Sequence, residues 1–568
     1  MTALLTENLP LLAGAPNGIK KLRELILELA VRGKLVPQDP SDELASELLK
    51  RIAEEKARLV AESKIKKTKL LEEIAEEEWP FVLPAGWEWS RLGDVSEYIQ
   101  RGKGPAYVDH SDFRVVSQKC VRWTGLDLQP ARFIAPESLV KYESIRFLRS
   151  GDILWNSTGT GTIGRACVVE NCSEDEQLVA DSHVTVVRPT GLLPVFLWRW
   201  IQSPSVQSEL EGNASGTTNQ IELNTSTVIA HLTPIPPLAE QHRIVAKVDE
   251  LMALCDRLEA QQADAESAHA QLVQALLGSL TQTSDASEFA ANWQSLAEHF
   301  HTLFTTEPSI DALKQTLLQL AVMGKLVPQD PSDEPVSELL ERVTEEKSRL
   351  VAAGALKKQK SLPEVSEEEK PYALPSNWKW VRFDSISNTR LGKMLDKAKN
   401  KGELRPYLRN TNVQWFNFEV DDLKSMRFEE HELDEYRVIP GDLVICEGGE
   451  PGRCAVWQGE VEDMFIQKAL HRARPWLGIS PFFLQFCLKA AARSGFLDQF
   501  FTGATIKHFS GEKLAKYPVP LPPLPEQHRI VAKVDQLMAL CDQLKTRLTQ
   551  ARQLNEQLAS TLVEQAVA

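Results

Sequence analysis

The chain has 568 residues, a length that indicates about three to four domains rather than one compact core. Hydrophobic residues make up 43% and charged residues 25%, as in ordinary globular proteins. No run reaches the ~18 apolar residues of a membrane span, and residues 1–20 lack the basic start of a secretory signal, so we expect a cytoplasmic protein without membrane contact. The 8 cysteines show no Cys-x-x-Cys and no zinc-like Cys/His spacing, which predicts reduced thiols and no metal site.

The net charge of −15 argues against a protein that is basic over its whole surface, as many nucleic-acid binders are. The charge is uneven, however. Acidic residues cluster at 72–78 and 367–369, whereas basic residues dominate 390–409. Because the local field depends on the distribution of charge, the negative total leaves room for a basic contact surface, and the acidic segments are candidates for contact with a basic partner protein.

A pair of helices opens the chain. Apolar residues at helical spacing predict a helix over 17–35, and Pro40-Ser41-Asp42 offers the start of a second one. The same text returns later, because LAVRGKLVPQDPSDE at 29–43 reappears as LAVMGKLVPQDPSDE at 320–334 with a single difference. We therefore expect a second helix pair over 310–351.

Each helix pair is followed by a segment of a different kind, roughly 96–235 and 387–521. Short apolar runs broken by Gly, Pro and Asn, such as VVSQKCVRW, GDILWNS, ACVVE and VTVVRP, are typical of strands. Each segment also holds one predicted helix, at 194–202 and 481–492. The text GDILWNSTGTGTIGRACVV at 151–169 corresponds to GDLVICEGGEPGRCAVW at 441–457. Each segment is therefore predicted to be a mixed, mostly β domain.

A long helix is predicted after each of two Pro-Pro pairs. PPLAEQHRIVAKVDELMALCDRL at 236–258 returns at 522–544 with three differences. Apolar residues three and four apart favour a coiled-coil seam, and about 40 helical residues span about 60 Å. The alternative is two separate helices, each packed on its own domain. The residues predicted to pack along the seam are Ile244, Val248, Leu251, Leu258, Ile530, Val534, Leu537 and Leu544.

The four matches occur in one order, with an offset that falls from 291 at the first to 286 at the last, so the chain is two copies of one domain-sized unit. The predicted fold is α+β, a pseudo-two-fold repeat with two mixed mostly-β domains separated by long antiparallel coiled-coil-like helices. Its division is a helical segment (1–78), a β domain (79–235), a central spacer helix region (236–290), a second helical segment (291–370), a second β domain (371–521) and a C-terminal spacer helix (522–568). The helical flanks are nearly identical and the β segments are not, which suggests one task done twice and two different tasks of one kind.

No catalytic motif stands out. Residues 159–164 match G-x-G-x-x-G, but a strand-like run follows where a dinucleotide site needs a helix, and the second copy breaks the pattern. A glycine-rich hairpin is the preferred interpretation. The sequence has no Walker A, H-E-x-x-H or G-x-S-x-G motif and no Asp/Asn-Pro-Pro-Tyr/Phe tetrapeptide. We therefore expect a non-catalytic chain that holds no cofactor.

Three polar segments recur at matching places in the two β domains, and their chemistry differs between the copies. Reading of DNA bases requires polar side chains on a rigid platform with cations nearby for phosphates. For any one of these residues alone, a turn or a surface position is the favoured interpretation, and only the joint pattern points to base reading. The candidates in the first domain are Ser117, Gln118, Lys119, Arg122, Asn156, Thr158, Thr160, Thr218, Asn219 and Gln220. The candidates in the second domain are Arg390, Lys393, Arg409, Asn410, Thr411, Asn412, Gln414, Arg453, Thr505, Lys507 and His508.

These features resemble the specificity subunit of type I restriction-modification enzymes over nearly the whole chain. The resemblance is carried by P-P-L-x-E-Q-H-R-I-V-A-K-V-D at 236–249 and 522–535, by G-D-I-L-W-N-S-T-G-T-x-x-I-G at 151–164 and by Y-L-R-N-T-N-V-Q at 407–414. It implies two target recognition domains that each read half of a split, asymmetric site in double-stranded DNA, with helices that set the gap. It also implies two adenine-methylating modification subunits that use S-adenosylmethionine, and restriction subunits that use ATP and Mg²⁺.

Two other functions remain open from the residues alone. One is a self-contained methyltransferase or nuclease, which would need a cofactor motif. The other is a non-catalytic scaffold that binds only protein through the helix pairs at 29–60 and 320–351. The divergent polar segments favour a DNA reader over both.

Overall fold

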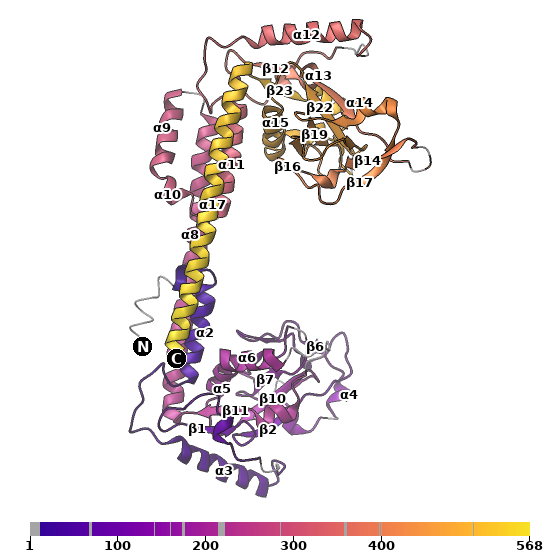
Figure 1. Cartoon of the computed structure of the whole chain (residues 1–568). Helices are drawn as coiled ribbons and strands as arrows, with labels where there is room; N and C mark the ends of the chain where they lie inside the picture. Colours follow the sequence, from indigo (N-terminus) through magenta and orange to yellow (C-terminus); the bar gives the residue numbers. More distant parts are fainter. Residues whose placement is uncertain are drawn as a thin grey trace. The chain divides into compact units, whose positions relative to one another are not determined.

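The computed structural model describes residues 12–67, 71–140, 142–159, 161–172, 177–213, 222–283, 286–356, 361–396, 398, 400–503 and 505–567. The chain divides into two compact units. The first unit comprises Met1–Ala265 with Ala551–Ala568, and the second comprises Glu266–Gln550. Two long helices, α8 (Leu238–Gln282) and α17 (Leu524–Val567), each begin in one unit and end in the other (Figure 1).

The first unit contains helices and a β domain. Its further helices are α2 (Gly18–Val31), α3 (Ala45–Ala61), α4 (Pro136–Leu139), α5 (Pro194–Gln202), α6 (Pro204–Asn213) and α7 (Thr225–Ala230), with short η1 (Glu76–Glu78) and η2 (Ser144–Arg146). Its strands are β1 (Glu88–Arg91), β2 (Ser96–Arg101), β3 (Arg114–Val116), β4 (Val121–Arg122), β5 (Gly125–Leu126), β6 (Arg132–Phe133), β7 (Ile153–Asn156), β8 (Ala166–Val168), β9 (Val179–Ala180), β10 (Val184–Pro189) and β11 (Leu232–Ile235).

The second unit repeats this plan. Its helices are α9 (Ala286–Glu298), α10 (Phe300–Leu303), α11 (Glu307–Val322), α12 (Val336–Ala352), α13 (Phe383–Ile386), α14 (Leu433–Tyr436), α15 (Pro481–Arg493) and α16 (Gly511–Lys516), with η3 (Glu367–Glu369), η4 (Asn410–Asn412), η5 (Glu430–Glu432) and η6 (Phe496–Phe500). Its strands are β12 (Lys379–Arg382), β13 (Ser387–Leu391), β14 (Glu403–Leu408), β15 (Val413–Gln414), β16 (Asn417–Phe418), β17 (Lys424–Phe428), β18 (Arg437–Val438), β19 (Leu443–Cys446), β20 (Cys454–Val456), β21 (Met464–Ile466), β22 (Leu470–Pro475) and β23 (Pro518–Leu521).

The two β domains share one topology. An antiparallel sheet has the strand order β2-β10-β7-β8 in the first unit and β13-β22-β19-β20 in the second. The second sheet has the order β6-β3-β9 in the first unit and β17-β14-β21-β18 in the second. Its parallel pair is β3 with β9 in the first unit and β14 with β21 in the second. In the first unit Leu154 and Val186 pack with Val116 of the second sheet, whereas Trp155 and Val187 pack on the α5 side. The alternation of side chains along a strand thus places the antiparallel sheet between two cores.

The predicted α+β class with two mostly β domains is confirmed, as are the strands at 153–156, 166–168 and 184–189. Strands β7 and β8 pair antiparallel on either side of the glycine-rich segment, so the predicted hairpin is confirmed. Helices α9 and α10 were not predicted. Among the described residues, none of the helices combines the length and the apolar character that crossing a membrane requires.

The repeated sequence motifs hold one another at the start of each long helix. In the first unit Glu240, 1% exposed, accepts hydrogen bonds from Trp87 Nε1 at 3.0 Å and Gln38 Nε2 at 2.7 Å. Arg243 pairs with Asp42 at 2.6 Å. Burial raises the pKa of Glu240, and the two hydrogen bonds lower it. Two motifs are therefore repeated together in the two units because they contact each other: P-Q-D-P-S-D-E and P-P-L-x-E-Q-H-R.

The second unit repeats these contacts. Glu526 accepts from Gln329 Nε2 at 2.7 Å, and Arg529 pairs with Asp333 at 2.6 Å. The following glutamine, Gln527, accepts from the backbone N–H of Ser480, the N-cap of α15, at 2.9 Å. Its counterpart in the first unit accepts from the N-cap of α5 in the same way. Each long helix is thus tied to its own β domain through its first turn.

The coiled-coil seam proves to be a three-helix arrangement inside each unit. In the first unit Ile244 and Val248 of α8 pack with α2 and with Ala559 near the end of α17. Lys34 donates to the carbonyl of Val567 at 2.7 Å, the last residue of α17. A cation at a helix C-terminus satisfies carbonyls that lack a partner in the helix.

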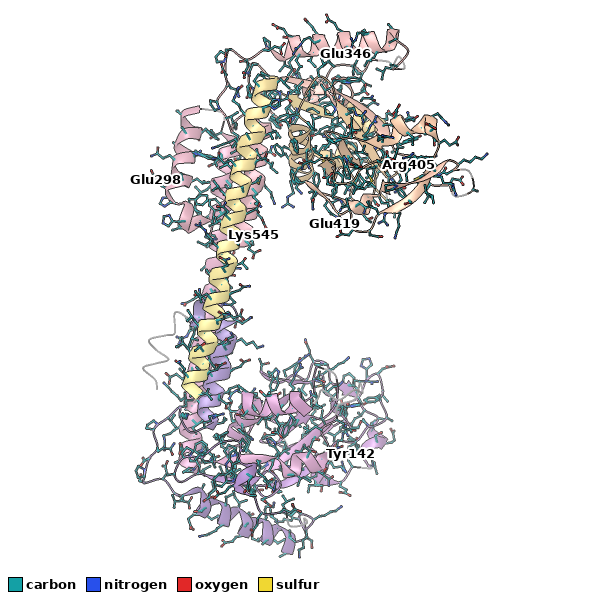
Figure 2. All side chains as sticks on the ribbon, viewed as in Figure 1. Tyr142, Glu298, Glu346, Arg405, Glu419 and Lys545 are labelled. Carbon is teal, nitrogen blue, oxygen red and sulfur yellow. The ribbon has the colours of Figure 1, made fainter. Side chains whose placement is uncertain are left out.

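The second unit places α11, the start of α17 and the end of α8 in the same way. Lys545 of α17, labelled in Figure 2, pairs with Asp311 of α11 at 3.2 Å. Lys325, the counterpart of Lys34, donates to the carbonyl of Thr281 in the last turn of α8 and to the carbonyl of Thr283 just after the helix. Of the predicted seam residues, Ile244, Val248, Ile530 and Val534 are buried, while Leu251, Leu258, Leu537 and Leu544 are partly buried against the same clusters. Helix pairing is therefore correct, but the third helix was not foreseen.

The core of the first β domain predicts a pH-dependent stability. Trp200 Nε1 donates to Nε2 of the largely buried His231 at 3.1 Å, and burial lowers the pKa of His231 to about 4. When the pKa of a histidine in the folded state lies below its unfolded value of ~6.5, the neutral histidine stabilises the fold. This contribution to the free energy of unfolding is fully present above pH ~6.5. We expect that contribution, which is at most about 3 kcal/mol, to be lost as the pH falls from about 6.5 to about 4.

Hydrogen exchange of the first unit at pH 7 and pH 5, in the full chain, measures this loss. His231→Gln is the matched control, since it keeps an acceptor for Trp200 without titrating. Parallel pH dependence in the wild type and in the variant would refute the assignment.

Candidate nucleic-acid interface

The predicted segments of the first domain meet at the glycine-rich hairpin. The side-chain amide of Asn156 donates to the backbone carbonyl of Gln118 at 3.1 Å. Gly159 has φ +104°, and a Cβ on it would lie 2.6 Å from Oε1 of Gln118. The glycine is therefore required both for its backbone conformation and for the close approach of the glutamine side chain. Thr158 of the hairpin bonds Nδ1 of His183 at 2.6 Å. Residues 117–123, 156–159, 161–165 and His183 form what we call the first polar surface.

The second domain repeats this geometry with other side chains. Gly449 has φ +84°, and a Cβ on it would lie 2.5 Å from Nδ2 of Asn410. Arg453 Nη2 donates to the carbonyl of Asn410 at 2.8 Å. A Cβ on Gly448 would lie 3.3 Å from Nδ1 of His508, so the third predicted segment reaches the hairpin as well. Residues 409–415, 446–453, 502–503 and 505–508 form the second polar surface.

Three of the predicted contact residues are buried, and we correct their role. Asn156 is fully buried, and Asn412 is 3% exposed. Asn412 Oδ1 accepts from the backbone N–H of Arg409 at 3.0 Å, so it fixes the turn of η4. Lys393 is 8% exposed and pairs with Glu432. Asn156 and Asn412 thus hold the backbone of the two surfaces, Lys393 is held in an ion pair, and none of the three side chains is presented for contact with a base.

Cations on the second polar surface are paired with exposed carboxylates. Arg409 pairs with Asp422 at 2.9 Å and Arg453 with Glu450 at 2.9 Å. The Asp422 side chain is 69% exposed. Because both carboxylates are more than half exposed, phosphates can compete with them for these cations.

The remaining predicted residues are distributed as follows. Lys119, Arg122, Thr411, Thr505, Lys507 and His508 are exposed, and Ser117, Gln118, Thr158, Asn410, Gln414 and Arg453 are partly buried. Arg390 is exposed but pairs with Glu435 of α14, away from the contacts described above. Thr160, Thr218, Asn219 and Gln220 lie outside the described residues.

Two groups at these surfaces were missed by sequence reasoning. His183 lies between β9 and β10 and carries no motif, although it directly precedes a predicted strand. Lys489 of α15 stands 4.2 Å over the ring of Trp415, whose Nε1 donates to Glu450 at 2.7 Å. The sequence predicted α15 only as a helix within the β domain, and its packing is what brings Lys489 to the surface.

The two surfaces are suited to recognition. Asn and Gln amides can bond adenine bidentately, Arg and Lys can bond guanine or phosphate, and backbone N–H groups beside glycine can approach a sugar-phosphate chain closely. Within the described part of the chain, no group of three or more His, Cys, Asp or Glu residues is arranged to hold a metal ion.

Comparison with known proteins places the chain in a family. The family model of the type I restriction modification DNA specificity domain matches residues 84–266 and 375–552, one match per β domain. The specificity subunits of the type I restriction enzymes EcoEI and EcoAI from Escherichia coli are each 38% identical, over 97% of this chain and 94% of theirs. A crystal structure of the HsdS subunit from Thermoanaerobacter tengcongensis shows 19% identity and a TM-score of 0.43, covering 86% of this chain and 98% of that one.

The family predicted from the repeated motifs is therefore confirmed, and the relatives are specificity subunits rather than the enzymatic subunits of such systems. More than half of the chain is covered by the family model, and the relatives extend that likeness to nearly its full length. This protein belongs to the specificity subunits of type I restriction-modification systems.

Proposed function

We propose that this chain reads a bipartite, asymmetric site in double-stranded DNA, with one half-site for each β domain. The observation that carries the proposal is the pair of equivalent polar surfaces. In each, a side-chain amide, Gln118 or Asn410, lies against a hairpin glycine, Gly159 or Gly449, held in the left-handed region. The same scaffold thus presents different side chains, as two readers of two different sequences require.

The partners follow from this role. Two methyltransferase subunits that use S-adenosylmethionine, and restriction subunits that use ATP and Mg²⁺, would supply the chemistry, and the cytoplasm is where all of them meet cellular DNA. The net charge of −15 is compatible with partners that contribute positive surface.

A protein-binding scaffold without a DNA preference is the second candidate. The identical contacts at the starts of α8 and α17 favour it as a partial description, because identical junctions can hold two copies of one partner. A scaffold gives no reason for the divergence of the polar surfaces, however.

Genome-wide adenine methylation tests the proposal. Cells that express this chain with its modification subunit are compared with cells that lack this chain. A new bipartite motif with a fixed gap is the expected result. If both proteins are folded and associated and no new methylation is found, the protein-binding scaffold becomes the remaining candidate function.

The hairpin glycines predict effects confined to one half-site. Gly449→Ala introduces a Cβ 2.5 Å from Asn410 Nδ2 at φ +84°, which strains the backbone by about 1–2 kcal/mol. We expect degeneracy in the second half of the methylated motif only, and Gly159→Ala should act on the first half only. Gly104→Ala, where the added Cβ would meet no other atom within 4 Å, should leave the motif unchanged. Equal effects on both halves would contradict one reader per half-site.

The length of the two long helices is expected to set the unspecified gap between the two half-sites. A heptad inserted after Ala265 in α8 together with a heptad after Gln550 in α17, where the two units meet along the chain, adds about 10 Å of helix. The unspecified gap should grow by about three base pairs, because base pairs rise by about 3.4 Å. The methylation motif of the double insertion gives the result, and an unchanged gap would mean that these helices do not set the distance.

A further inference from the structure

A buried histidine lies directly beneath the second polar surface. His471, on β22, is 1% exposed and sits opposite Ile445 of β19 in the sheet register. Its Nε2 lies 2.8 Å from the carbonyl oxygen of Phe509. A carbonyl can only accept a hydrogen bond, so Nε2 carries the proton and donates it.

This hydrogen bond closes a chain of contacts through the surface. Phe509 N–H donates to the carbonyl of Glu447 at 2.7 Å, and Glu447 N–H donates to the carbonyl of Ala469 at 2.9 Å. Glu447 lies at the start of the hairpin, Phe509 directly follows His508 of the third segment, and Ala469 directly precedes β22. The imidazole therefore joins the strand to the loop that carries His508, while the backbone joins that loop to the hairpin.

The first unit builds the same backbone and omits the imidazole. Leu223 N–H donates to Ser157 O at 2.8 Å, and Ser157 N–H donates to His183 O at 2.9 Å. The position of His471 is taken by Thr185, which lies opposite Trp155 of β7 and shares a hydrogen bond with the Ser157 hydroxyl. The side chain under the first surface thus ties β10 to the hairpin, whereas the one under the second surface ties β22 to the third segment.

We infer that His471 is a positioning residue for recognition of the second half-site, because it fixes the third segment (502–503 and 505–508) against the hairpin 446–453. It does not touch DNA itself. The side chain fixed most directly is His508, whose ring stands over Gly448. This inference rests on the proposed function, which supplies the half-site that His471 would affect.

The environment of His471 is compatible with a neutral donor. Burial lowers the pKa of His471, while the hydrogen bond to Phe509 and the charge of Glu447 raise it. A Cβ on Gly511 would lie 3.6 Å from its Cε1, so the start of α16 packs closely on the ring. The site is small, and a donor of the same reach is needed to replace the imidazole.

Two substitutions of similar size separate positioning from packing. His471→Gln keeps an N–H donor at about the place of Nε2, and His471→Met fills the space without a donor. Both are made in the full chain and purified with the modification subunit. The dissociation constant is measured at one fixed salt concentration for the duplex carrying the methylation motif and for duplexes with either half scrambled.

We expect His471→Met to lower discrimination at the second half-site about tenfold, as removal of the donor leaves the buried carbonyl of Phe509 without its partner. Discrimination at the first half-site should not change, and His471→Gln should stay within about twofold of the wild type. Thr185→Val is the matched control in the first unit and should affect only the first half-site. Equal losses in the Met and Gln variants, or equal losses at both halves, would overturn the inference.

A second measurement does not depend on DNA. Hydrogen exchange of the backbone amides of Glu447 and Phe509 should be faster in His471→Met than in the wild type and near the wild-type rate in His471→Gln. If the wild type yields no methylation motif, the proposed function fails, and the exchange rates still decide whether His471 holds the segment. If the wild type reads a bipartite motif and both variants exchange alike, the inference about His471 fails by itself.

Discussion

The arrangement of each unit depends on a buried carboxylate in the first turn of its long helix. Glu240 and Glu526 are at most 1% exposed, and a carboxylate in that position is tolerated only if neighbouring groups donate hydrogen bonds to it. Those donors come from distant parts of the chain, Gln38 and Trp87 in the first unit and Gln329 in the second. The helix N-terminus adds a favourable field for the negative charge. One residue thus brings together the helical flank, the edge of the β domain and the long helix.

This junction explains why some parts of the chain are repeated nearly letter for letter. A residue whose partners are buried and mutually hydrogen-bonded cannot change alone, since each change would leave a polar group unsatisfied. At the same junctions, Asp42 and Asp333 are buried side chains that pair with the half-exposed Arg243 and Arg529. The exposed side chains of the polar surfaces carry no such constraint, because they end in solvent or in exposed ion pairs. Their scaffold is preserved through backbone hydrogen bonds, which leave the side chains free to differ.

Each long helix ends in the unit in which the other one begins. The last residues of α17 pack with α2 in the first unit, and the last residues of α8 pack with α11 in the second. Lys34 and Lys325 bind the final carbonyls in each case. Each helix therefore begins on the β domain that precedes it in the sequence and ends in the other unit. This connectivity suits a subunit whose two recognition domains must act on one DNA molecule.

The sequence by itself determined the duplication, the order of helical and β segments, the glycine-rich hairpin and the family, because these depend on local periodicity and on repeated text. It also located the segments of both polar surfaces. Only the tertiary structure decided which residues of those segments are exposed. Asn156 and Asn412 look like base readers in the sequence and are buried supports, whereas His183 and Lys489 carry no motif and reach the surfaces. The reason is physical: exposure and hydrogen-bond partners are set by contacts between strands and loops far apart in the chain, and no local pattern encodes them.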